Sequence, residues 1–393
     1  MLASVRFALV LLGAQAAFCT GAAPYRPPSD QQVVETLPAR AADPRMREMR
    51  ESRAALARNP RDLDLALRLA RLYYAEVAAE GDPRYIGYAQ AALAPWWDEP
   101  APPAEARVMR AILRQFNHGF DAANADLDAA LQADPANGQA WAWRAAIAMV
   151  QADYAQARRA CLGLQPRASN LIGSACRAQV DGTTGQAPAA ALALRSALAR
   201  SSHAPAAERL WALTRLAEIE ERLGEHAAAE ASYRLALELG LVDGYLLAAY
   251  SDFLLDRDRP REVLALLKDK GRSDLLLLRL ALAAKALGDP ALKVWESELA
   301  ARFDAARLRG DSVHEKEEAR FALAVQGQPA RALVLAQQNF AVQREPADAR
   351  VLLEAALGAG QPAAAAPALK WMADAGIESA VLRGLERKLK GPP

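Results

Sequence analysis

The sequence predicts an all-α protein built from stacked helical hairpins. Alanine and leucine dominate its 393 residues, whereas only six isoleucines and five threonines occur. Alanine and leucine are strong helix formers, and β-branched residues are the ones that strands favour. A small residue is also followed four positions later by a larger one, at intervals of 34, 34, 33, 39 and 34 residues. The pairs are Ala89 with Leu93, Ala123 with Leu127, Ala157 with Cys161, Ala190 with Leu194, Ala229 with Tyr233, and Val263 with Leu267. A period near 34 indicates hairpins that are each too small to bury their apolar face alone and therefore stack.

The bulk composition allows a large core and argues against some classes of partner. Hydrophobic residues make up 52% of the chain, and 48 basic residues nearly balance 47 acidic ones, for a formal charge of +1. Nucleic acids and anionic membranes select strongly basic surfaces. We therefore expect no nucleic-acid partner.

Residues 1–22 have the pattern of a signal peptide. A positive charge at Arg6 precedes the apolar run from Phe7 to Leu12, and small residues follow. Two cleavage sites fit, after Ala16 or after Ala22. The apolar run is too short for a membrane span, so no transmembrane segment is expected in the mature chain. The pattern predicts a periplasmic or secreted protein.

Cys19 offers an alternative to simple secretion, because a lipid anchor could be attached there. Phe18 precedes it, however, where a lipoprotein signal carries a small residue. Simple secretion is therefore favoured over lipidation.

Cleavage at the second site leaves Cys161 and Cys176 as the cysteines of the mature chain. In the repeat register they fall on the second helix of one hairpin and the first helix of the next. An even pair in an exported protein favours a disulfide. The alternative is two small buried thiols, because free cysteine is often a core residue.

The clearest repeat runs from about residue 104 to residue 137. Its first helix carries Ala111, a turn follows at His118 to Asp121, and its second helix carries Ala123 and Ala130 before Pro135 stops it. This unit resembles the tetratricopeptide repeat (TPR), which has an aromatic residue near the turn, small residues at the helix crossings and a closing proline. The resemblance implies a right-handed superhelical solenoid of TPR-like hairpins. It covers residues 60–360, after an extended leader and an initial helix at 23–59 and before C-terminal capping helices at 361–393.

The same resemblance implies a partner groove on the inner face of each first helix. Mapped by register, the groove residues are Val108, Ile112, Gln115, Phe116, Gln139, Met149, Trp211, Thr214, Glu218, Arg222, His314, Glu317 and Phe321. This set is mainly apolar with few cations, which excludes the family's mode of gripping a peptide carboxylate with repeated Lys, Arg and Asn. It suits an extended or helical peptide instead. The alternative is that these residues pack against a neighbouring helix.

No catalytic, cofactor or metal residue is expected. His314 and Glu317 lie one helical turn apart, but two ligands make half a zinc site, and a solvated charged face is the simpler interpretation. His203 follows Ser202, yet no Gly-x-Ser-x-Gly elbow accompanies the pair. Phosphate-binding loops and dinucleotide fingerprints do not occur in the sequence.

The segment from residue 80 to residue 103 departs from the repeat. Trp96 and Trp97 stand between prolines and could anchor a partner. The register instead places them at core positions, which favours packing, and leaves the roles of Arg84 and Tyr85 open.

Together these features predict an exported, non-enzymatic scaffold that binds a protein or peptide of the cell envelope. Two alternatives remain. One is an assembly factor for an envelope complex, in polysaccharide export or in cytochrome or metalloprotein maturation. The other is a metal-binding protein or an enzyme. The oligomeric state is left open.

Overall fold

The computed structural model describes residue 29 and residues 43–310 and 315–390. The chain divides into a first unit, residues 1–47, and a second unit, residues 48–393, which contains α2 and every later helix. The expected signal peptide, Cys19 and most of the leader lie outside the described residues. The described part of the chain is all helix, turn and loop. The fold is therefore all-α, as predicted.

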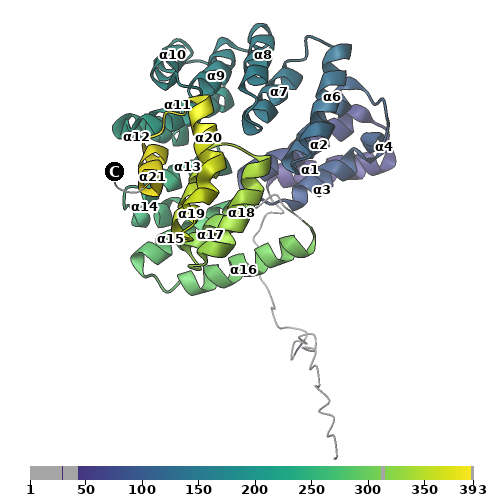
Figure 1. The fold of residues 1–393 in the computed structure, drawn as a ribbon. Helices are drawn as coiled ribbons and strands as arrows, with labels where there is room; N and C mark the ends of the chain where they lie inside the picture. The colour runs from purple at the N-terminus through teal and green to yellow at the C-terminus, as the bar shows by residue number, and fades with distance from the viewer. Residues whose placement is uncertain (1–28, 30–42, 311–314, 391–393) are drawn as a thin grey trace, which may run out of the picture. The chain divides into compact units, whose positions relative to one another are not determined.

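Consecutive helices pair into hairpins along the second unit (Figure 1). The N-terminal helices are α1 (Pro44–Arg58), α2 (Leu63–Glu80), α3 (Arg84–Ala92), α4 (Ala94–Trp97), α5 (Ala104–Phe116), α6 (Phe120–Ala133), α7 (Gly138–Val150), α8 (Tyr154–Leu164), α9 (Asn170–Asp181) and α10 (Ala187–Arg200). The C-terminal helices are α11 (Ala206–Leu223), α12 (His226–Leu237), α13 (Gly244–Leu255), α14 (Pro260–Leu266), α15 (Asp274–Leu287), α16 (Leu292–Leu308), α17 (Glu315–Ala324), α18 (Pro329–Val342), α19 (Pro346–Gly358), α20 (Ala366–Ala375) and α21 (Ala380–Lys390). Short 3₁₀ turns follow α8 at Gln165–Arg167 and precede α20 at Pro362–Ala365.

The periodic pairs found in the sequence are the crossing points of these hairpins. Ala123 and Leu127 of α6 are fully buried, and so are Ala229 of α12 and Val263 of α14. All twelve residues of the six pairs are at most 5% exposed. A side chain no larger than Ala or Val at the crossing lets the two helices approach closely, and the larger residue one turn later fills the space beside it. The predicted solenoid of helical hairpins is confirmed by this packing.

Local chemistry sets where the helices begin and end. The side chains of Asp62, Asn137 and Asp243 each accept a hydrogen bond from a backbone N–H in the first turn of α2, α7 and α13. Gly224 ends α11 with a φ of 83°, a left-handed conformation that a side chain would disfavour. These caps fix the lengths of the helices and the positions of the turns between them.

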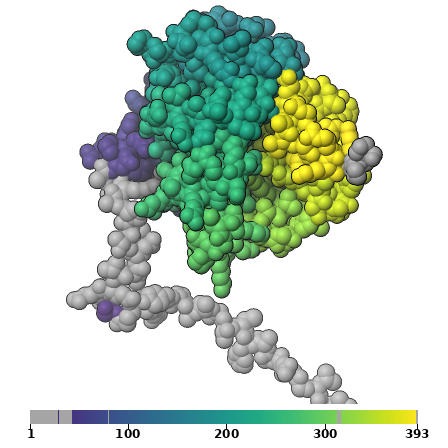
Figure 2. Space-filling view, turned by 90° about the vertical axis from the view of Figure 1, so that its left-hand side faces the viewer, coloured from purple at the N-terminus to yellow at the C-terminus, as the bar shows by residue number. Residues whose placement is uncertain are grey.

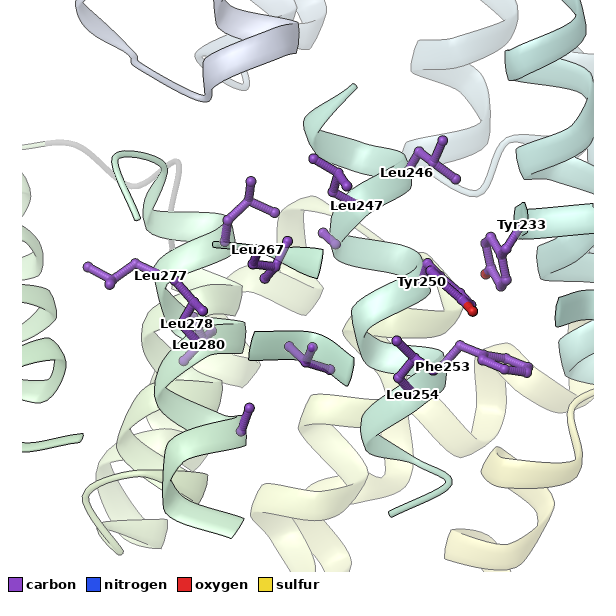
Figure 3. Packing of buried hydrophobic residues seen from close by; sticks show 14 of the residues in the cluster. Tyr233, Leu246, Leu247, Tyr250, Phe253, Leu254, Leu267, Leu277, Leu278 and Leu280 are labelled. Atoms are coloured by element: carbon purple, nitrogen blue, oxygen red, sulfur yellow. The ribbon is translucent and has the colours of Figure 1, made fainter. Parts of the chain in front are cut away.

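One large apolar cluster of the second unit is formed by residues of α11 to α17 (Figure 3). The rings of Tyr233, Tyr250 and Phe253 lie with their centroids 5.4–5.9 Å apart, in tilted, edge and stacked arrangements. Figure 3 also labels leucines of the same cluster, namely Leu246, Leu247 and Leu254 of α13, Leu267 just after α14, and Leu277, Leu278 and Leu280 of α15. Aromatic contacts of this kind add to the stabilisation that burial alone supplies.

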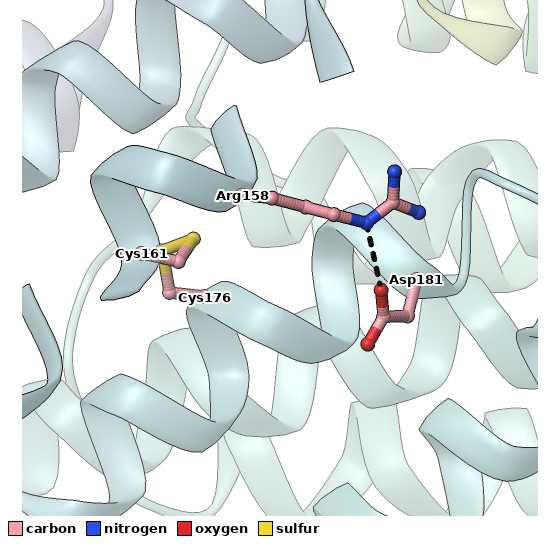
Figure 4. Close-up of a disulfide and its surroundings, with 4 residues drawn as sticks. All are labelled: Arg158, Cys161, Cys176 and Asp181. Carbon is pink, nitrogen blue, oxygen red and sulfur yellow. Dashed lines mark hydrogen bonds and ion pairs between the residues drawn. A yellow bond between two sulfur atoms is a disulfide. The ribbon is translucent and has the colours of Figure 1, made fainter. Parts of the chain in front are cut away.

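Cys161 of α8 and Cys176 of α9 are bonded in the structure, with their Cα atoms 5.7 Å apart (Figure 4). Nearby, Arg158 Nε donates to Asp181 Oδ1 at 3.4 Å across the same pair of helices. The disulfide therefore links the second helix of one hairpin to the first helix of the next.

The C-terminal helices of the second unit return to its middle hairpins. Arg344 N donates to Val150 O at 2.8 Å, and Trp371 Nε1 donates to the Tyr154 hydroxyl at 3.0 Å. Farther along, Ala187 N donates to a Glu378 carboxylate oxygen at 2.6 Å. Figure 2 shows the yellow C-terminal helices beside the teal and green ones. We call this boundary the seam. It closes the inner face of the array into a cavity.

A charged cavity on the inner face of the helical array

A cavity of the second unit with many charged lining residues, called the main cavity below, has a volume of about 260 Å³. Its wall comes from α11, α13, α15, α17 and α19, the first helices of five consecutive hairpins, with additions from α7, α8, α9, α12 and α21. Inner-face residues follow the spacing of one helical face, as Tyr245, Ala248, Ala249 and Asp252 do on α13. A second cavity, of about 620 Å³, shares Tyr154 and Arg344 with it. These two residues therefore lie at the boundary between the cavities.

The wall of the main cavity is densely charged. Its cations are Arg215, Arg222, Arg279, Lys316, Arg320, Arg344 and Arg350, and its acids are Glu218, Glu221, Asp252, Glu317, Glu345 and Glu354. The expectation of a mainly apolar groove with few cations is therefore wrong. The predicted set contained no residue of α15 or α19, and on α17 it contained Glu317 and Phe321 but not the cations Lys316 and Arg320.

Asp252 is the centre of one ion-pair network. Arg279 donates to both of its carboxylate oxygens, at 3.1 Å and 2.6 Å, and Arg320 Nη1 donates to Oδ1 at 2.7 Å. Burial alone would raise the pKa of Asp252, but the two guanidinium groups hold it below its ordinary value. The network joins α13, α15 and α17 at the cavity wall.

Lys316 forms the second network, between α17 and α19. Its Nζ lies 3.9 Å from Glu317 Oε1 and 3.7 Å from Asp348 Oδ1. The negative charge of Glu317, followed by that of Asp348, raises the pKa of Lys316. Asp348 is almost fully buried and also accepts from the backbone N–H of Glu345 at 2.9 Å, so it fixes the start of α19.

An aromatic residue and a guanidinium project from neighbouring hairpins into the cavity. The Arg215 guanidinium of α11 lies 4.6 Å from the ring centroid of Tyr245 of α13, a cation–π distance. Arg215 Nη1 also lies 3.1 Å from Glu218 Oε2, and Glu218 accepts from the Tyr245 hydroxyl. Tyr245 is 49% exposed, yet the surrounding wall raises the pKa of its hydroxyl by desolvation. Its free surface is therefore available to an occupant of the cavity.

Glu221 is a cavity acid whose pKa is raised into the neutral range. Burial raises its pKa to about 7, although the Tyr233 hydroxyl, which donates to Oε2 at 3.0 Å, opposes the shift. The charges of Asp256 and Asp252 act in the same direction as burial. Glu221 is therefore partly protonated near neutral pH.

Four of the sequence-predicted groove residues line the main cavity: Met149, Glu218, Arg222 and Glu317. Gln139 is exposed on α7, outside the cavity lining, and Gln115 and Phe116 are half-buried on α5. Gln115 hydrogen-bonds to Tyr74. Trp211 packs half-buried between the apolar clusters around α9 and α11. His314 lies outside the described residues.

Four other predicted groove residues are buried between helices. Val108 and Ile112 are each 2% exposed on α5, and the Thr214 hydroxyl donates to Leu210 O at 2.8 Å within α11. The ring of Phe321 lies 5.5 Å from that of Phe303 in the core. Because their faces turn toward neighbouring helices, these four residues offer no surface to a partner, which corrects the expectation for them.

The positions on α11 show why some of the predicted groove residues do not line the cavity. The cavity-lining face contains Arg215, Glu218 and Arg222, at spacings of three and four residues. The sequence predicts Trp211, Thr214 and Glu218 for this face. In the first half of the helix it therefore selects Thr214, one residue before the cavity-lining Arg215. The charged pair Arg215 and Glu218, one turn apart, was the signal available for this face.

The tryptophans of the 80–103 segment have structural partners. Trp96 is 5% exposed, and the backbone oxygens of Trp96 and Trp97 accept from Arg110 Nη1 at 3.0 Å and 2.6 Å. Arg110 in turn pairs with Asp126 at 2.6 Å. Trp96 therefore packs in the core, and Trp97 is half-buried beside it.

No group of three or more His, Cys, Asp or Glu side chains is placed to hold a metal ion within residues 43–310 and 315–390. Within the same ranges, no helix combines the length and the apolar character that crossing a bilayer requires.

Comparisons with known proteins carry no argument about this chain's fold or function. No protein-family model and no curated protein matches the sequence. Among solved structures, the chain is similar to a crystal structure of the TPR domain of P58(IPK), with 16% identity over 89% of this chain and 94% of that chain. The TM-score of that match is 0.23. The description of the fold as TPR-like hairpins therefore rests on the hairpin packing and the buried crossing residues of this chain.

Proposed function

We propose that this protein is a non-catalytic binding protein that takes a segment of a protein partner into the charged cavity. The observation that carries the proposal is which helices form the wall of the cavity. Five consecutive hairpins each contribute the inner face of their first helix to one cavity. A surface assembled in this way is the feature by which helical solenoids recognise other molecules.

The chemistry of the wall supports recognition of a polar segment. Tyr and Arg side chains dominate the energetics of protein interfaces, and Tyr245 and Arg215 stack at the cavity wall. The ion pairs around Asp252 and Lys316 hold charges of both signs in fixed positions. Preorganised charges give specificity because a mismatched partner would leave them desolvated and unpaired.

We further propose that the protein acts outside the cytoplasm, on a partner in the cell envelope. Two observations support this location. The N-terminal sequence has the charge and apolar run of a signal peptide, and Cys161 and Cys176 are bonded in the structure. Structural disulfides persist in oxidising compartments and are rare in the cytosol.

Affinity capture with a matched pair of variants tests the binding proposal. Tyr245 lines the cavity and Tyr88 of α3 lies outside its lining, yet each is 49% exposed. We expect Tyr245→Ala to weaken capture of the partner from a crosslinked envelope fraction at least tenfold, whereas Tyr88→Ala retains it. Equal capture by both variants would show that the partner does not use the cavity.

A further inference from the structure

The seam between the C-terminal helices and the middle hairpins contains two cations that form no ion pair with any described residue. Five of the seven cavity cations take part in ion pairs: Arg215, Arg279, Lys316, Arg320 and Arg350. The other two, Arg222 and Arg344, form no ion pair with any described residue. Arg222, Arg344 and Tyr154 all line this one cavity, and the charges of both arginines act on the Tyr154 hydroxyl.

Arg222 is fixed in place but incompletely satisfied. Its Nη2 donates to Gly182 O at 3.1 Å, in the turn between α9 and α10. Its Nε is buried and has no hydrogen-bond partner among the described residues. Burial lowers the pKa of Arg222, and the nearby charge of Arg215 lowers it further, while Glu218 opposes both. A buried guanidinium donor without an acceptor is costly, so this group favours an incoming acceptor.

Arg344 lines the same cavity as Arg222, from the segment before α19. Its backbone N–H donates to Val150 O, and its exposed side chain lines both cavities. Glu345 is the nearest acid in sequence and also acts on Tyr154. Burial and the charge of Asp348 raise the pKa of Glu345, so it is a weak counter-ion for the two arginines.

We propose that the seam is a binding site for an anionic oxygen group of a small ligand, of the phosphate or carboxylate class, held by Arg222 and Arg344. Guanidinium groups bind such oxygens through two parallel hydrogen bonds. The ligand would bridge α11 and the segment before α19, and would therefore stabilise the closed seam. This site lies within the lining of the charged cavity, but its ligand is a small anion and not the protein partner proposed above.

Thermal unfolding of the full mature chain tests this inference. The probes are inorganic phosphate and acetate, each titrated to 50 mM at constant ionic strength. A ligand that binds only the folded protein raises the melting temperature with saturation. We expect one of the two anions to raise it by about 2 °C with a midpoint in the millimolar range. The anion that does so identifies the ligand class.

Four variants make the result specific. Arg344→Gln and Arg222→Gln should each remove the saturating rise in melting temperature. Because Arg344 is exposed, its variant should fold and the test stays valid even if the Arg222 variant does not fold. Arg261→Gln, at an exposed position of α14 outside the cavity lining, should retain the rise. Glu345→Gln should leave the midpoint concentration nearly unchanged, because the raised pKa already makes Glu345 a weak counter-ion. The inference is overturned if neither anion gives a saturating rise, or if the rise persists in Arg344→Gln. Phosphate also stabilises proteins in general by exclusion from their surface, which the Arg344→Gln comparison removes.

Discussion

Arg279 of α15 donates two hydrogen bonds to Asp252 of α13, from Nε to Oδ1 at 3.1 Å and from Nη2 to Oδ2 at 2.6 Å. The side chain of Arg279 is only 7% exposed. A guanidinium in this position depends on its carboxylate partner, because water cannot replace the lost charge. The pair therefore fixes one hairpin against the next at the wall of the cavity.

Replacing Asp252 with asparagine should be strongly destabilising. The change leaves Arg279 and Arg320 without their shared counter-ion, and breaking a buried ion pair on one side costs about 3–5 kcal/mol. Urea denaturation of the variant measures the loss. Asp374→Asn is the control, because the ion pair of Asp374 with Lys370 is 61–76% exposed and should be worth about 0–1 kcal/mol. Equal effects of the two substitutions would contradict the role of Asp252.

A larger residue at a crossing position should disrupt a hairpin. Ala123→Leu adds three carbon atoms where α5 and α6 meet, at a site that is fully buried, and should cost about 1–3 kcal/mol. Ala122→Leu makes the same change on the exposed side of α6 and should alter stability by less than about 0.5 kcal/mol. Chemical denaturation of both variants decides the matter. A neutral Ala123→Leu would mean that the crossing tolerates a wider separation than the packing indicates.

The fold was more predictable than the site, and the reason is visible in particular residues. Close packing within one hairpin requires a small residue at Ala123 and a larger one at Leu127. The same requirement recurs in each hairpin, so it appears in the sequence as a period near 34 residues that marks the helix crossings. The cavity depends on relationships between hairpins. Arg344 meets Val150, and Trp371 meets Tyr154, across more than 190 residues, and no local period encodes such contacts. A one-residue error of register on α11 was also enough to exchange Thr214 for Arg215.

The cysteine pair should be oxidised in protein taken from its native compartment. Non-reducing intact mass should then be lower by the mass of two hydrogen atoms than the mass after reduction. The loop closed between Cys161 and Cys176 spans 15 residues, so reduction should lower the free energy of unfolding by about 3 kcal/mol in the chain-entropy estimate. Two thiols that react with an alkylating reagent without prior reduction would contradict both the bond and the proposed location.

The titration of Glu221 gives stability a pH dependence of defined sign. Its pKa is about 7 in the folded protein and about 4.5 in the unfolded chain. Between these values the folded protein keeps a proton that the unfolded chain releases, so this contribution to stability is complete below about pH 4.5 and is lost as the pH rises through 7. Urea midpoints at pH 5 and pH 8 should therefore differ.

Glu221→Gln should reduce the difference between the free energies of unfolding at pH 5 and pH 8 by about 1–2 kcal/mol. This is less than the full pKa shift implies, because solvent in the cavity screens the group. Glu238→Gln, at an exposed position just after α12, is the control and should leave the difference unchanged. If the stability of Glu221→Gln depended on pH as much as that of the unsubstituted protein, titration of groups other than Glu221 would be responsible for the pH dependence.

Photo-crosslinking from within the cavity tests the central claim most directly. Ala347 is exposed and lines the cavity, whereas Ala227 is exposed on α12 outside the cavity lining. A photoreactive side chain at either position should leave the packing intact. The account predicts a discrete adduct with a partner protein from position 347 and none from position 227 after irradiation in the envelope. Adducts from position 227 alone, or equal adducts from both positions, would contradict binding in the cavity.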